Sequence, residues 1–185
     1  MRFYAACLAS YNNGRLHGTW IDASDDIEAM QEEVNAMLRA SPFPNVMVKH
    51  PETGESVPSA EEWAIHDHEG FGLLDEYAGL ATIAEAFNIN EVAEEHDIPL
   101  AVLQQAMSDA AADYAGDFVS DHYRGYADDW AAFAEDFMTE THDMREIPDW
   151  VKYRIDWAGV GHDLEISGDF NGIRHDGTLY VFWNH

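Results

Sequence analysis

The most regular chemical pattern in this chain is a row of carboxylates: Asp109, Asp113, Asp117 and Asp121 recur at intervals of four residues. In a helix this interval places the four side chains on one face, with a negative charge about every 6 Å along the axis. Each like-charged pair at this interval costs about 0.2–0.5 kcal/mol, so the row does not stabilise its own helix. The pattern predicts either a contact surface for a positively charged partner or a solvated helix face.

The segment after this row is acidic as well. Consecutive phosphates along one DNA strand are about 3.4 Å apart, so the row alone is too sparse to imitate a strand. We therefore predict that the row and the acids after it together form a partner-binding surface. Its further members are Asp128, Asp129, Glu135, Asp136, Glu140, Asp143 and Glu146.

A metal site is the alternative chemistry for the segment His66-Asp67-His68-Glu69, which has suitable donor atoms. The chain lacks the spacings of an EF-hand loop, a zinc-protease helix and a Cys/His zinc cluster. Strand alternation would also point His66 and His68 away from Asp67 and Glu69. A structural or surface role is favoured, and we predict neither a metal nor a cofactor.

Catalysis is not indicated by any nucleophile. Cys7, the single cysteine, lies in the apolar run Phe3–Ala9, which is typical of a buried and unreactive thiol. The chain has no nucleophile elbow, phosphate-binding loop or dinucleotide fingerprint. We predict that the protein is not an enzyme; a hydrolase built on an unfamiliar constellation is the alternative.

The charge of the chain argues against direct contact with nucleic acid. Its 185 residues include 9 Lys and Arg against 36 Asp and Glu, a formal net charge of −27, and no Lys or Arg occurs in the 74 residues between Lys49 and Arg124. Residues 82–106 resemble a helix-turn-helix, but this stretch has no basic group to contact phosphates. We expect a positively charged partner, and adaptation to high salt or a merely acidic protein are the alternatives.

Composition indicates a folded chain. With 46% hydrophobic and 12% aromatic residues it can bury a core, unlike a disordered acidic tail. No apolar run is long enough for a transmembrane helix, and the start of the chain lacks a secretory pattern. The expected location is therefore the cytoplasm, without a membrane contact.

Two helices are expected to carry the acidic residues. The apolar spacing predicts one long helix over residues 99–122, with Pro99 in its first turn, and a second helix over residues 127–144. Before them, residues 70–105 are expected to be helical, with Asn90 as the cap of a separate helix over Glu91–His96. After Pro148, a helix is expected over Trp157–Leu164.

Both ends of the chain are expected to be β-rich. Strands over Phe3–Ser10 and Arg15–Asp22 flank the turn signal Asn12-Asn13-Gly14, and Ser24 is placed to cap a helix that continues to Leu38. Strands over Asn45–His50 and about 63–67 follow, and the chain closes with a hairpin, Asp169–Arg174 and Thr178–Trp183. The fold class is α+β, with abutting domains at residues 1–69, 70–105 and 106–185.

Three blocks of this sequence form a distinctive set. The first block is Tyr4-Ala5-Ala6-Cys7-Leu8-Ala9-Ser10-Tyr11-Asn12-Asn13-Gly14, followed by Leu16-His17-Gly18 and Trp20-Ile21-Asp22. The second is Glu61-Glu62-Trp63-Ala64-Ile65-His66-Asp67 with Glu69-Gly70-Phe71, and the third is Tyr153, Ile155-Asp156-Trp157 and Asp163-Leu164. Together these blocks resemble the ArdA family of antirestriction proteins, and the resemblance covers nearly the whole chain.

The resemblance implies an elongated, curved homodimer with three small domains per chain and a DNA-like surface charge. It implies inhibition of type I restriction–modification enzymes on behalf of mobile elements, through the methyltransferase core, without a cofactor. The acidic antirestriction stretch of the family matches about Glu135–Pro148, which Arg145 interrupts. An acidic binding module for another basic nucleic-acid-binding protein is the alternative function.

Overall fold

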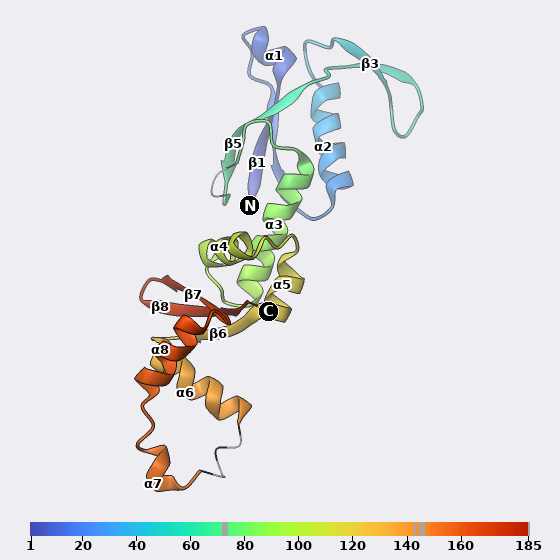
Figure 1. Cartoon of the computed structure of the whole chain (residues 1–185). Coiled ribbons are helices and arrows are strands. Elements are labelled where there is room, and N and C mark those ends of the chain that lie inside the picture. Colours follow the sequence, from blue (N-terminus) through green and yellow to red (C-terminus); the bar gives the residue numbers. More distant parts are fainter. Residues whose placement is uncertain (72–73, 143, 145–146, 185) are drawn as a thin grey trace. The chain divides into compact units, whose positions relative to one another are not determined.

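The computed structural model describes residues 1–71, 74–142, 144 and 147–184. The chain divides into two compact units, residues 1–88 and residues 89–185 (Figure 1). Each unit combines helices with antiparallel strands, which confirms the α+β class. The division into three domains stays a prediction. None of the described helices has the length and apolar character needed to cross a membrane.

The first unit is built on a three-stranded antiparallel sheet in the order β2-β1-β5, formed by Gly18–Asp22, Arg2–Cys7 and Trp63–Glu69. The predicted pairing of the first two strands is confirmed, but the first strand ends at Cys7 rather than Ser10. A short helix, α1 (Leu8–Asn12), follows because Ser10 turns inward, where its amide donates to Cys7 Sγ and its hydroxyl contacts Ser41 Oγ.

Helix α2 (Ile27–Arg39) covers this sheet with the predicted apolar face, including buried Met30, Val34 and Leu38. Its cap is Asp26 rather than Ser24, because the Asp26 carboxylate accepts a hydrogen bond from the amide of Ala29 at 2.8 Å. The chain then forms an antiparallel pair, β3 (Val46–Lys49) and β4 (Ser56–Ser59), before β5.

Helix α3 (Leu80–Glu95) runs through Asn90, so the predicted separate helix over Glu91–His96 is wrong. The amide group of Asn90 donates to Glu94 Oε1 at 2.8 Å, one turn further along the same helix, instead of capping a helix start. The predicted start of the helical segment near residue 70 is also wrong, since residues 74–79 form a turn and irregular chain before the helix begins at Leu80.

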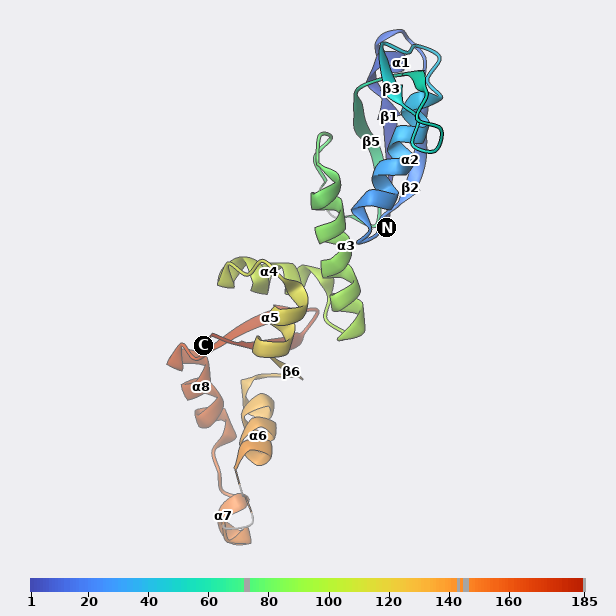
Figure 2. The same cartoon turned by 90° about the vertical axis from the view of Figure 1, so that its right-hand side faces the viewer.

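The second unit encloses a sheet in the order β6-β8-β7, formed by Tyr123–Ala127, Thr178–Trp183 and Phe170–His175 (labelled in Figure 1; Figure 2 shows the chain turned by 90°). The predicted C-terminal hairpin is confirmed, whereas β6 was not predicted. Alternation along β8 sends Phe182 toward α4 (Leu100–Ala110) and α5 (Ala115–His122). Its neighbours Leu179 and Val181 pack toward α6 (Trp130–Thr141) and α8 (Trp157–Ser167), and α7 (Asp149–Lys152) lies between those two helices in sequence.

The predicted single helix over residues 99–122 is wrong. It is two helices, because Ala111 adopts a left-handed backbone conformation (φ +52°) that ends α4, and Tyr114 is extended before α5 begins. The apolar period continues across the break since both helices place residues in one core, Leu103 and Met107 from the first and Phe118 from the second.

Trp130, the first residue of α6, is held between two glycines. A Cβ on Gly161 of α8 would collide with the carbonyl group of Trp130, and a Cβ on Gly172 of β7 would collide with its indole ring. Helix α6 can therefore lie this close to α8 and to the sheet only because both positions lack a side chain.

Candidate partner-binding surface

The predicted acidic surface lies in the second unit. All members that the structure describes are exposed: Asp109, Asp113, Asp117, Asp121, Asp128, Asp129, Glu135, Asp136 and Glu140. The two remaining members, Asp143 and Glu146, lie outside the described residues. Exposure is what contact with a partner requires, and it is equally what a solvated face would show.

The row of four aspartates does not lie on one helix. Asp109 is in the last turn of α4, Asp113 is in the connection after it, and Asp117 and Asp121 are on α5. Only the last pair therefore has the one-turn spacing that the sequence predicted for all four. The expected continuous stripe is wrong because of the backbone reversal at Ala111.

Two of the described acids also have local structural roles. The Asp129 carboxylate caps α6 by accepting a hydrogen bond from the amide of Ala132, and Asp109 Oδ2 accepts one from the side-chain amide of Asn171 at 3.2 Å. Asp129 therefore caps a helix in addition to contributing negative charge to the surface, which is the only role predicted for it.

Two basic side chains near this surface, Arg124 and Arg174, bond to backbone carbonyls rather than to its carboxylates. Arg124 donates to the backbone carbonyls of Tyr123 and Asp121 and lies 4.9 Å from the centroid of the Trp183 ring. Arg174 donates to the backbone carbonyl of Asp128. Within the described part of the chain, none of the nine acids forms an ion pair.

Acidic residues outnumber basic residues in both units. Residues 89–185 contain 21 acidic and 5 basic residues, a net charge of −16, and residues 1–88 contain 15 and 4, a net charge of −11. Arg124 and Arg174 bond to carbonyl oxygens, so neither of them pairs with the carboxylates of this surface. Such a surface attracts cations and basic proteins and repels nucleic acid.

Asp97 joins this surface although the sequence analysis did not select it. It follows α3 and lines one pocket together with Asp136 and Glu140 of α6. No signal in the sequence pointed to this contact, because the residues are about forty positions apart and the segment around Asp97 carries no periodic pattern.

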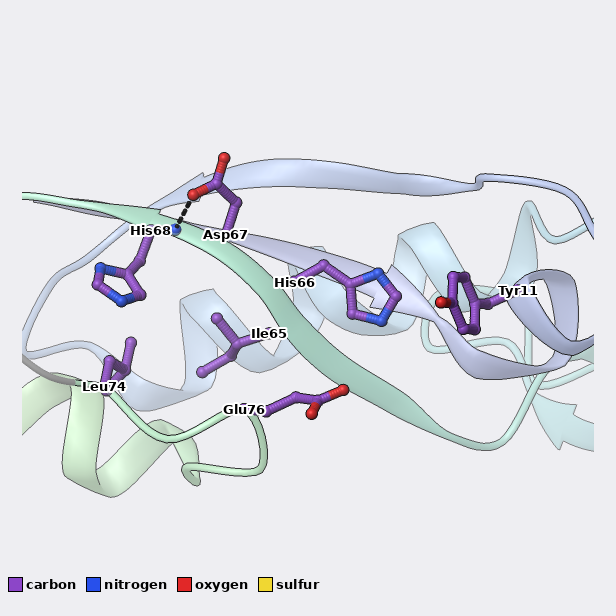
Figure 3. Close-up of a pocket in the computed structure, with 7 residues that line it drawn as sticks. All are labelled: Tyr11, Ile65, His66, Asp67, His68, Leu74 and Glu76. Carbon is purple, nitrogen blue, oxygen red and sulfur yellow. Dashed lines mark hydrogen bonds between the residues drawn. The ribbon is translucent and has the colours of Figure 1, made fainter.

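A second pocket, of about 530 Å³, lies in the first unit and contains the candidate histidines (Figure 3). His66 and His68 point into it, and the carboxylate of Asp67 points to the opposite side of β5, as strand alternation predicted. Glu69 is held by Arg2 through two hydrogen bonds of 2.8 and 3.0 Å, which together with the arginine charge lower the pKa of that carboxyl.

The donor atoms of this pocket do not converge on a metal position. His66 contacts the ring of Tyr11, with centroids 4.8 Å apart, and His68 contacts the ring of Phe71. Among the described residues, no three His, Cys, Asp or Glu side chains are grouped so that they would hold a metal ion.

Cys7 is fully buried, as predicted. Burial raises the pKa of its thiol, but hydrogen bonds with Ser10 and Ser41 outweigh burial and bring the pKa below its ordinary value. The thiol donates to Ser41 Oγ at 3.3 Å and accepts from the Ser10 amide at 3.4 Å. These contacts hold α1 and the segment after α2 against the sheet, and they give no substrate access to the sulfur.

Comparison with known proteins identifies one family. The model of the family described as antirestriction protein (ArdA) matches residues 3–177. A comparison with curated proteins gave no match. The matched range covers most of both units and every residue of the candidate surface.

Proposed function

The chain belongs to the ArdA family of antirestriction proteins, and from this membership we propose that it inhibits type I restriction–modification enzymes as an acidic DNA mimic. In this proposal its acidic surface occupies the DNA-binding groove of the methyltransferase core. The protein acts in the cytoplasm as a homodimer, without catalysis, a cofactor or direct contact with nucleic acid.

The observation that supports this proposal is the set of nine exposed acids, none of which forms an ion pair with another residue that the structure describes. A DNA-binding groove is lined with Lys and Arg that neutralise phosphates and release counterions. Carboxylates that are already paired with arginines of the same chain would contribute little to binding in such a groove. Here Arg124 and Arg174 bond to carbonyl oxygens instead, so the negative charge stays available to a partner.

Binding to a purified type I methyltransferase, measured by isothermal titration, tests this function. We expect tight binding that weakens as salt rises, because screening shortens the Debye length from about 10 Å at 0.1 M to about 3 Å at 1 M. Duplex DNA carrying the recognition site should compete. Binding to a basic nucleic-acid-binding protein of another class, with no binding to type I methyltransferases, would instead favour the alternative acidic module.

The distribution of the binding energy separates mimicry from a hidden active site. Single exposed ion pairs contribute about 0–1 kcal/mol, so Asp117→Asn alone should change binding little. The combined Asn variant of Asp109, Asp113, Asp117 and Asp121 should weaken it measurably, with circular dichroism as the control for folding. Loss of all activity from one such substitution in a folded protein contradicts distributed mimicry.

A further inference from the structure

The pocket that contains Asp97 has the features of a binding site within the acidic surface. Its volume is about 320 Å³, at the lower end of the range for ligand pockets. It lies entirely within the second unit, between the segment after α3, strand β6 and helix α6. Its lining residues fall into an aromatic group and a charged group, which have separate roles.

The aromatic group forms the floor and walls. Phe133 and Phe137 of α6 stack with ring centroids 5.6 Å apart, and Tyr123 and Tyr126 of β6 also line the space. Phe133 is buried, whereas Tyr126 is exposed. An aromatic lining of this kind accepts the flat face of an organic cation, because the ring faces carry negative charge density.

The hydroxyl group of Tyr123 adds a polar group with no hydrogen-bond partner. Its oxygen is buried, and no described residue donates to it or accepts from it. A buried hydroxyl without a partner is costly, and because this oxygen is closed to solvent, Tyr123 contributes to the pocket lining through its ring. Burial raises the pKa of Tyr123 to about 12, so the hydroxyl stays neutral near physiological pH.

The charged group makes the pocket anionic. Asp97, Asp136 and Glu140 face one guanidinium, Arg124, and one imidazole, His96. Arg124 is already satisfied by two carbonyls and by the ring of Trp183, and it forms no ion pair with the three carboxylates. The three carboxylates are therefore available to bind a cation that belongs to another molecule.

We propose that this pocket receives the guanidinium group of an arginine side chain from the restriction–modification partner, an inference that rests on the function proposed above. A guanidinium is planar, stacks on aromatic rings and binds carboxylates through two parallel hydrogen bonds, which an ammonium group cannot do. The pocket lining supplies both kinds of contact: the rings of Phe137 and Tyr126, and the carboxylates of Asp97, Asp136 and Glu140. One anchored arginine would then add to the distributed charge of the surrounding surface.

Variants test the anchor in the complex. Asp136→Asn with Glu140→Gln should weaken methyltransferase binding at least about tenfold, since removing one partner of a desolvated charge pair is costly. The charge-matched control, Glu165→Gln with Asp176→Asn on exposed positions outside the surface, should weaken it less than about threefold. Tyr123→Phe, which keeps the ring and removes only the inaccessible hydroxyl, should change binding by less than about threefold.

A direct probe tests the pocket without any partner. The full chain is titrated with Nα-acetyl-arginine amide while the aromatic NMR signals of Tyr123 and Phe137 are followed. We expect saturable shifts that disappear in the Asp136→Asn, Glu140→Gln variant. The neutral isostere Nα-acetyl-citrulline amide should cause none, and Nα-acetyl-lysine amide should cause weaker ones.

The two proposals fail in different ways. Equal losses of binding for the pocket variant and its control, or the absence of saturable arginine shifts, overturn the anchor but leave the inhibitor function standing. Equal shifts with the lysine probe overturn the choice of guanidinium. Failure of the wild-type protein to bind any type I methyltransferase overturns the proposed function, and the arginine titration still reports on the pocket by itself.

Discussion

The carboxylate of Asp129 accepts a hydrogen bond of 2.9 Å from the backbone amide of Ala132 and so caps helix α6. Replacing an aspartate cap by alanine costs about 0.5–2 kcal/mol, and Asp129→Ala should lower the free energy of unfolding by that amount. Asp128→Ala is the neighbouring control, since the contact shown for Asp128 among the described residues is made by its backbone carbonyl, toward Arg174, and the substitution should change stability by less than about 0.5 kcal/mol. The free energy of unfolding of both variants, measured in urea, tests this prediction. Equal losses of stability would contradict a capping role for Asp129.

Ala111 is the position at which α4 ends, with φ +52°. An L-residue pays about 1–2 kcal/mol for this conformation, which glycine avoids at a smaller entropic cost. Ala111→Gly should therefore stabilise the protein by about 0.5–1 kcal/mol in urea unfolding. If residues 99–122 formed one helix, glycine would destabilise it by about 1 kcal/mol, so the sign of the change distinguishes the two arrangements.

Gly161 allows α8 to pack against the backbone of α6. Gly161→Ala should destabilise the second unit by about 1–3 kcal/mol, because backbone cannot move aside as a side-chain end can. Gly116→Ala on α5 is the matched control, since nothing lies within 4 Å of the added carbon, and it should be stabilising by about 0.5–1 kcal/mol. Thermal unfolding of both variants tests the contrast, and a harmless Gly161→Ala would contradict the close packing.

Tyr123 gives the protein a specific sensitivity to alkaline pH. Its pKa is raised to about 12, mainly by burial and further by Tyr180, Tyr126 and Asp97, and a tyrosine in the unfolded chain ionises near pH 10. The unfolded state therefore loses its proton first, so this contribution to stability is complete below about pH 10 and declines as the pH rises toward 12. Urea midpoints from pH 8 to 11 should fall less steeply for Tyr123→Phe than for the wild type; parallel curves would contradict this origin.

The protein itself should not bind duplex DNA. Neutralisation of phosphates needs basic groups, and the longest stretch without any covers the 74 residues from 50 to 123. A gel-shift experiment at low salt with micromolar protein should show free DNA only. A clear shift without any partner present would contradict the mimic.

Local signals in the sequence were sufficient for several elements. The hairpin of β7 and β8 was predicted because alternation and the Asp176-Gly177 turn are both local, and the structure shows positive φ at both turn residues. Helix α2 was predicted because its apolar spacing is regular. In these cases the short-range preference and the tertiary contact agree.

The features that escaped prediction depend on distant partners. Strand β6 is short and contains Gly125, and it is a strand because β8, more than fifty residues later, pairs with it. The break at Ala111 involves neither glycine nor proline, so no local signal marks it. The nine described acids of the candidate surface are exposed, as a surface requires. The pocket that brings Asp97 close to Asp136 arises only when α6 packs beside β6.

Trp130, held between Gly161 and Gly172, places the whole of α6 and with it Glu135, Asp136 and Glu140. The acids themselves can be exchanged one at a time at small cost, since each is exposed. The two glycines cannot be exchanged in this way, because a single methyl group at either one pushes on Trp130 and shifts all three carboxylates together. For folding stability, the three exposed acids therefore tolerate substitution and the two glycines do not, although it is the acids that would contact a partner.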